Sequence, residues 1–144
     1  MDNSGIRKIT QDVLGGPDVL RVVEADVPVP GPTEILVETR AIGVNPADWK
    51  TRASGGRLGA PPFTLGWEVA GVALNDEDAR AVVDVEGVPM LVEPDRAGLD
   101  VLPGHALEGE IRVLVDRVFP LAEAAAAHES GESGHTSGKL VLRP

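Results

Sequence analysis

Glycine and proline restrict the fold of this chain more than any other residues, because 17 glycines and 12 prolines are spread over its 144 residues. Both residue types interrupt helices and strands, so this density predicts many short elements joined by turns and argues against a bundle of long helices. Hydrophobic residues make up 42% of the chain, which is enough for the packed core of one domain. We therefore expect a mainly β, α+β chain with two or three short helices.

Short apolar and β-branched stretches, bounded by turn residues, predict the strands of this fold. They are residues 6–11, 20–25, 34–44, 65–74, 88–92, 111–115 and 139–142. The strongest candidate is the third, EILVETRAIGV, because its apolar residues alternate onto one face. The segment 88–92 contains Pro89, which lacks a backbone donor and therefore favours the edge of a sheet.

Helix signals occur at three places in the sequence. Asn45 followed by Pro46 is typical of a helix start, because asparagine caps a first turn and proline fits its first position. The segment 95–102 has helical character and is expected to end at Pro103–Gly104. The alanine-rich segment 120–129, PLAEAAAAHE, is the clearest helix.

Charge and residue usage exclude several classes of function. With 13 basic and 23 acidic residues the chain carries a net charge of −10, which argues against nucleic acid or an anionic membrane as a partner. No apolar run is long enough to span a membrane, and the start MDNSGIRK has no signal-peptide core, so we expect a cytoplasmic protein. The absence of cysteine excludes disulfides, thiol catalysis and cysteine–zinc sites. Scarce lysine beside abundant alanine, valine, glycine and proline is typical of GC-rich bacterial coding.

Three blocks of sequence, taken together and in order, resemble the quinone oxidoreductase branch of the medium-chain dehydrogenase/reductase family. The first is GGPDVLRVVEADVPVPGPTEILVETRAIGVNPADWKTR, and the last is VDRVFPLAEAAAAHESGESGHTSGKLVL. The middle block, PPFTLGWEVAGV, matches the family pattern at Pro62, Gly66, Glu68, Ala70 and Gly71. The resemblance covers about residues 7–74 and 110–142, and it implies a GroES-like catalytic domain.

The centre of the chain departs from that family. Family members carry a doubly wound nucleotide domain that begins with a glycine-rich turn facing the pyrophosphate. Neither G-x-G-x-x-G nor A-x-x-G-G-V-G occurs here, and the nearest glycines, Gly55, Gly56 and Gly59, follow no strand. We therefore expect a truncated form with a partial GroES-like barrel and no bound cofactor. Its expected parts are 1–74 and 110–144 from the catalytic domain, with 75–109 as the remnant of the deleted domain.

The residues also predict that the chain holds no metal. Asn45 and Trp67 stand where zinc-dependent relatives have cysteine and histidine. Glu68 remains, but one carboxylate with three scattered histidines is not a zinc site. His128 lies on the alanine-rich helix, where we expect a structural role.

The resemblance also indicates candidate site residues. Asn45, Asp48 and Lys50 match the family motif N-x-x-D-x-K/R beside the substrate cleft. In the catalytic interpretation Asp48 is a general acid or base and Asn45 donates a hydrogen bond to an oxyanion. In the local interpretation Asn45 caps the helix and Asp48 pairs with a nearby cation. The apolar candidates for binding a substrate beside Lys50 are Trp49, Phe63 and Trp67.

Three functions remain open on this evidence. The first is a cofactor-independent cyclase or isomerase that acts on a bulky apolar metabolite such as a polyketide. The second is an NADPH-dependent quinone or enone oxidoreductase that needs a partner to supply the nucleotide domain. The third is a non-catalytic binding or assembly module, or an engineered deletion. Because a shortened barrel leaves unpaired strand edges, we also expect a homodimer, paired through Val82 to Val92.

Overall fold

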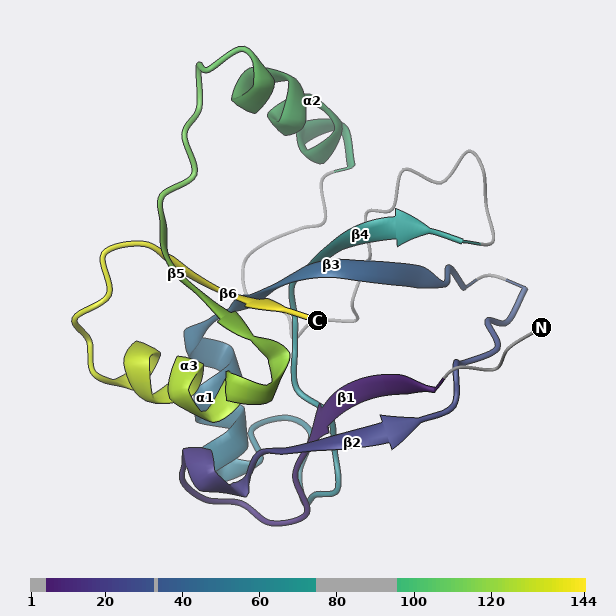
Figure 1. Cartoon of the computed structure of the whole chain (residues 1–144), viewed down its shortest axis with the longest axis vertical. Helices are drawn as coiled ribbons and strands as arrows, with labels where there is room; N and C mark the ends of the chain where they lie inside the picture. Colours follow the sequence, from purple (N-terminus) through teal and green to yellow (C-terminus); the bar gives the residue numbers. More distant parts are fainter. Residues whose placement is uncertain (1–4, 33, 75–95) are drawn as a thin grey trace.

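The computed structural model describes residues 5–32, 34–74 and 96–144. The described part is an α+β arrangement of two sheets with helices packed beside them (Figure 1). The strands are β1 (Ile6–Thr10), β2 (Arg21–Ala25), β3 (Val37–Val44), β4 (Val69–Ala73), β5 (Val115–Pro120) and β6 (Lys139–Arg143). The helices are α1 (Pro46–Ser54), α2 (Arg96–Leu107) and α3 (Ala124–Glu132), with short 3₁₀ turns η1 (Pro17–Val19) and η2 (Leu121–Glu123). The predicted fold class is confirmed.

The larger sheet joins the two ends of the chain. Its strand order is β4-β3-β6-β5, so β3 from the first half pairs with β6 from the last residues. β3 is antiparallel to both neighbours, whereas β5 and β6 run parallel and are connected through η2 and α3. β1 and β2 form a separate antiparallel pair, which faces the larger sheet in Figure 1.

The hydrophobic core lies where α3 packs against β3, β5 and β6. Its buried apolar residues are Val44, Phe119, Leu121, Ala124, Ala127, Leu140 and Leu142. The alanines and Gly131 make α3 thin, which allows close packing against its neighbours. A Cβ atom on Gly131 would lie 2.5 Å from the ring of Trp49, so this glycine is what lets α1 and α3 approach each other.

Several predicted boundaries are wrong. β3 begins at Val37 and not at residue 34, and β4 begins at Val69 and not at residue 65. α2 continues through Pro103 to Leu107, because the Glu108 amide still bonds to the Gly104 carbonyl (3.0 Å) and proline removes only its own donor. The chain instead turns at Gly109, whose φ is +78°. The predicted strand 111–115 begins only at Val115, because pairing with β6 starts there. The alanine-rich helix begins as η2 and extends to Glu132.

Some predicted features lie outside the described residues. These are the strand 88–92 and the dimer-pairing segment Val82 to Val92. Within the described part, no helix has the length and apolar character needed to cross a membrane.

Candidate functional site

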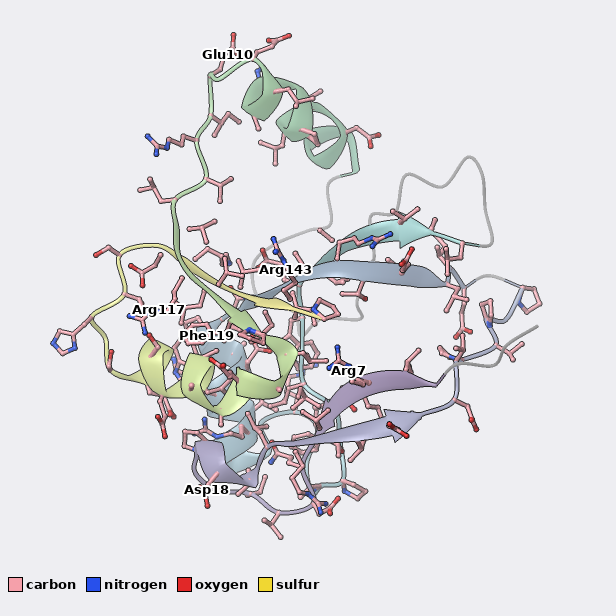
Figure 2. The ribbon with its side chains drawn as sticks, viewed as in Figure 1. Arg7, Asp18, Glu110, Arg117, Phe119 and Arg143 are labelled. Atoms are coloured by element: carbon pink, nitrogen blue, oxygen red, sulfur yellow. The ribbon has the colours of Figure 1, made fainter. Side chains whose placement is uncertain are left out.

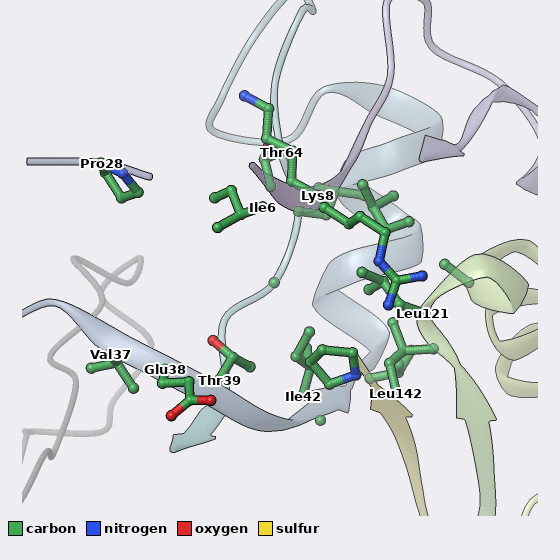
Figure 3. A pocket seen from close by; sticks show the side chains of 18 of the residues that line it. Ile6, Lys8, Pro28, Val37, Glu38, Thr39, Ile42, Thr64, Leu121 and Leu142 are labelled. Atoms are coloured by element: carbon green, nitrogen blue, oxygen red, sulfur yellow. The ribbon is translucent and has the colours of Figure 1, made fainter. Parts of the chain in front are cut away.

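A cavity of about 750 Å³ lies between β1 and the larger sheet. Figure 3 shows Ile6 on β1 beside the cavity and Val37, Thr39 and Ile42 on β3, while the Lys8 ammonium is turned away from β3. Leu121 and Leu142 line it on the side of the core. The wall is mostly apolar, and two buried titratable side chains, Asp48 and His128, are part of it.

The start of α1 places Asp48 in that wall. Asn45 is extended (φ −126°, ψ 161°) and caps the helix, and Pro46 occupies the first turn as the sequence predicts. Asp48 is the third helical residue, and its Oδ2 accepts a hydrogen bond from the Asn45 backbone amide at 2.7 Å. This bond is one half of a capping box, so the local sequence fixes the direction of the carboxyl group.

The environment of Asp48 raises the pKa of its carboxyl group toward neutral pH. The residue is only 2% exposed, and its Oδ1 has no hydrogen-bond partner among the described residues. Burial raises the pKa of Asp48 from 3.8 to about 6, opposed by the Asn45 amide. The charge of Glu68 raises this pKa further, and the charge of Lys139 lowers it. A carboxyl group with a pKa near neutral pH is suited to take up and release protons.

Three polar side chains beside Asp48 form a closed hydrogen-bonded group. Lys139 Nζ donates to Asn45 Oδ1 (2.7 Å) and to Glu68 Oε2 (2.8 Å), while Asn45 Nδ2 donates to the same oxygen of Glu68 (3.0 Å). Partial burial raises the pKa of Glu68, but these hydrogen bonds outweigh it and hold the pKa below its usual value. Gly43 makes room for the group, since a Cβ atom there would lie 2.6 Å from the Glu68 carboxyl carbon. Asn45 is therefore held in place by Glu68, which directly precedes β4, and by Lys139 of β6.

His128 enters the cavity wall from α3 and is held by Arg52. The Arg52 guanidinium is 2% exposed and contacts His128 Nδ1 (3.2 Å), Glu132 Oε1 (2.7 Å) and the Gly15 carbonyl (3.0 Å). Because a guanidinium only donates, His128 Nδ1 accepts and Nε2 carries the proton. Burial and the Arg52 charge lower the pKa of His128 to about 4, against the opposing charge of Glu132. His128 is therefore a neutral donor near pH 7.

The sequence assigns His128 only a structural role, and the structure adds its place in the cavity wall. The small residues on the same face of α3 could have indicated that His128 points into the protein. Ala124 lies four residues before it and Gly131 three residues after it, on the same helix face, and both are buried. A polar residue on such a small-residue face points into the protein interior.

The six predicted site residues have different surroundings. Asp48 lines the cavity, whereas Asn45, Trp49, Lys50, Phe63 and Trp67 are not among its lining residues. Trp49 packs on α3 and against the core, and Lys50 is exposed.

The two remaining candidates lie on the chain segment before β4. Phe63 pairs with Gln11 through backbone hydrogen bonds of 3.2 and 3.3 Å. Trp67 is partly buried, and its Nε1 has no partner among the described residues.

One grouping among the described residues has the geometry to hold a metal ion. His105, Glu108 and Glu110, at the end of α2, have potential ligand atoms within 4.8 Å of one another. The turn at Gly109 brings Glu110 back to His105, whose Nδ1 lies 2.5 Å from Glu110 Oε2. All three residues are exposed, and they lie outside the wall of the cavity. The sequence alone does not predict this grouping.

The glycines nearest to a nucleotide motif do not fit a phosphate. Gly55 caps the C-terminus of α1 in the left-handed conformation (φ +80°), with its amide bonded to the Thr51 carbonyl. Phosphates bind at helix N-termini, where free amides and the positive end of the dipole point toward them. This loop lies at the C-terminal end of its helix, so it does not offer a phosphate site of that kind.

Comparison with known proteins identifies relatives of the chain. A family model described as zinc-binding dehydrogenase matches residues 43–142. A quinone oxidoreductase of Lama guanicoe is 40% identical over 70 residues, which cover 46% of this chain and 21% of that protein. The trans-enoyl reductase poxP of Penicillium oxalicum is 38% identical over 52 residues, which cover 36% and 13%. These alignments thus span about a fifth or less of the curated relatives.

A solved structure shares the fold. The quinone oxidoreductase of Coxiella burnetii matches with a TM-score of 0.82 and 14% identity, over 98% of this chain and 100% of that chain. The zinc in the family description does not fit the residues around Glu68. Its carboxylate is already paired with the Lys139 ammonium at 2.8 Å, and Asn45 is the other contact. Zinc prefers thiolate, imidazole and carboxylate ligands, and an ammonium group in their place repels the ion.

Proposed function

This chain belongs to the zinc-binding dehydrogenase family, in its quinone oxidoreductase branch, and we propose that it is a cofactor-independent acid–base catalyst. Its reaction is the isomerisation or cyclisation of a bulky apolar carbonyl compound, a class that includes polyketides. The observation that carries the proposal is Asp48, a buried carboxyl group with a pKa of about 6 and an unpartnered oxygen in the wall of the cavity.

The size and lining of the cavity support this substrate class. Pockets for drug-sized molecules have volumes of about 300–1,000 Å³ and mostly apolar walls with a few polar groups. A cavity of about 750 Å³ between β1 and β3 falls in that range. Its apolar wall desolvates the substrate and strengthens every charge interaction inside it.

In the proposed reaction Asp48 Oδ1 takes a proton from the carbon next to the substrate carbonyl. The electron pair of the broken C–H bond moves toward the carbonyl oxygen, which becomes an enolate oxygen. His128 Nε2–H donates a hydrogen bond to that oxygen, as neutral imidazole donors do at developing negative charge. The proton held by Asp48 exchanges with solvent, and Asp48 then delivers a proton to another carbon of the conjugated system. One proton is taken and one is given back, so the isomerisation is balanced without a cofactor.

Asn45 acts in this proposal as a positioning residue. Its backbone amide holds Asp48 Oδ2, and its side chain is bonded to Glu68 and Lys139. Oδ2 is therefore fixed. Oδ1 is buried and has no hydrogen-bond partner among the described residues, and in this proposal it becomes the atom that the substrate contacts on binding.

Exchange of a carbon-bound proton tests the proposal without knowledge of the natural substrate. The probe is 2-tetralone in D₂O, without nucleotide, and the loss of its α-proton signals is followed by proton NMR. We expect exchange above the buffer rate for the wild type and its loss in Asp48→Asn. Asp26→Asn, which changes an exposed aspartate, is the matched control and keeps the activity. Equal exchange rates for Asp48→Asn and the wild type contradict the proposal.

The second candidate function is an NADPH-dependent reductase completed by a partner domain. It is favoured by the resemblance to relatives named as quinone oxidoreductases and a trans-enoyl reductase. Titration of NADPH followed by its fluorescence separates the two functions. Saturable binding with a micromolar constant supports the reductase, and the acid–base proposal predicts none.

A further inference from the structure

One cation faces the cavity from the inner side of β1. Side chains alternate along a strand, which places Arg7, Ile9 and Gln11 on one face. Ile9 packs against the core and Gln11 is fully buried, so this is the face turned toward the protein interior. Figure 2 shows Arg7 extending from β1 toward the larger sheet, and Arg7 lines the cavity.

Arg7 has no salt bridge within the described part of the chain. Glu24 lies opposite it in the register of β1 and β2, but no ion pair joins the two residues. Besides Asp48, the wall contains Glu38, which is already paired with Arg40 at 2.9 Å, and Pro144, whose terminal carboxylate forms no ion pair with Arg7. The guanidinium is exposed, so a molecule in the cavity can reach it. In a chain with net charge −10, Arg7 thus presents to the cavity a cation that no salt bridge with another described residue neutralises.

We propose that the molecule bound in the cavity is an amphipathic organic anion, whose carboxylate pairs with Arg7 and whose apolar body lies between β1 and β3. A guanidinium binds a carboxylate through two parallel hydrogen bonds, which also fixes the orientation of the ligand. Lys8, on the next position of β1, belongs to the opposite face of the strand, but it borders the cavity and adds positive charge near Arg7. This inference rests on the proposed function, because it names the class of its substrate.

Two probes that differ only in charge test the inference. These are 2-naphthoate and its neutral analogue 2-naphthamide, titrated by calorimetry into the wild type near pH 7. We expect 2-naphthoate to bind at least about tenfold more tightly, which corresponds to about 1.4 kcal/mol. Arg7→Met removes this preference and leaves the affinity for 2-naphthamide unchanged, whereas Arg7→Lys keeps part of it. Arg112→Met is the matched control at an exposed position outside the cavity, and it keeps the full preference.

Three outcomes overturn the inference. They are equal affinity of the wild type for both probes, a preference that survives in Arg7→Met, and no binding of 2-naphthoate at about 1 mM. If Arg7→Met does not fold, the wild type is treated with phenylglyoxal, which modifies arginine, and the modification of Arg7 is measured by mass spectrometry. Protection of Arg7 by 2-naphthoate then supports the inference, and unchanged modification overturns it. Asp48→Asn separates this inference from the proposed function. Loss of proton exchange with an intact charge preference supports both, and exchange that survives in Asp48→Asn refutes only the acid–base reaction.

Discussion

The stability of the protein should carry a pH signature from Asp48. Its pKa is about 6 in the folded state, against 3.8 for an ordinary aspartate, because burial disfavours its charged form. The folded state therefore holds this proton more tightly than the unfolded chain does. The contribution of Asp48 to the free energy of unfolding is fully present below pH 3.8 and is lost as the pH rises through about 6.

The magnitude follows from the interval between the two pKa values. At about 1.4 kcal/mol per pH unit, ionisation of Asp48 lowers the free energy of unfolding by about 3 kcal/mol between acid and alkaline pH. Asp48→Asn removes the titration and retains an oxygen that can accept the bond from the Asn45 amide. The difference in free energy of unfolding, Asp48→Asn minus wild type, should therefore rise by about 3 kcal/mol from low pH to high pH.

Urea unfolding followed by tryptophan fluorescence measures this difference, at a series of pH values from about 3.5 to about 8. Any constant cost of the new amide group cancels, because only the change of the difference with pH is used. The titration of Glu68 is present in both proteins and cancels to first order. Asp26→Asn, at an exposed position, should track the wild type. A difference between Asp48→Asn and the wild type that stays constant across this range would refute the account of a buried carboxyl group with a raised pKa.

Three further predictions concern Gly43, Lys139 and the oligomeric state of the chain. Gly43→Ala should lower the free energy of unfolding by about 1–3 kcal/mol in urea titrations, since its Cβ would lie 2.6 Å from the Glu68 carboxyl carbon; an unchanged midpoint contradicts the close approach. Lys139→Met should raise the pKa of Asp48, because it removes a nearby positive charge, and carboxyl-carbon NMR should record the higher midpoint; a lower midpoint refutes the assignment. We propose that the chain forms a homodimer, so light scattering at low micromolar concentration should give twice 15.0 kDa, and a mass near that of one chain rejects it.

Local sequence determined much of the fold. Alternating apolar residues marked β3, and Asn45 with Pro46 marked the start of α1. The family pattern around Glu68 identified the quinone oxidoreductase branch, which the comparisons confirm. These features depend on neighbours a few residues apart, which a sequence displays directly. At Pro103 the local rule that proline ends a helix predicts the wrong boundary, because α2 continues to Leu107.

The character of the candidate site was decided by the tertiary structure. Asp48 is in a recognisable motif, but its raised pKa comes from burial in a cavity wall and from Glu68 and Lys139, which β4 and β6 bring to it. His128 acquires its tautomer and its lowered pKa from Arg52, 76 residues away in sequence. Desolvation and charge interactions depend on distances in space, so residue types and spacing cannot fix them until the chain has folded.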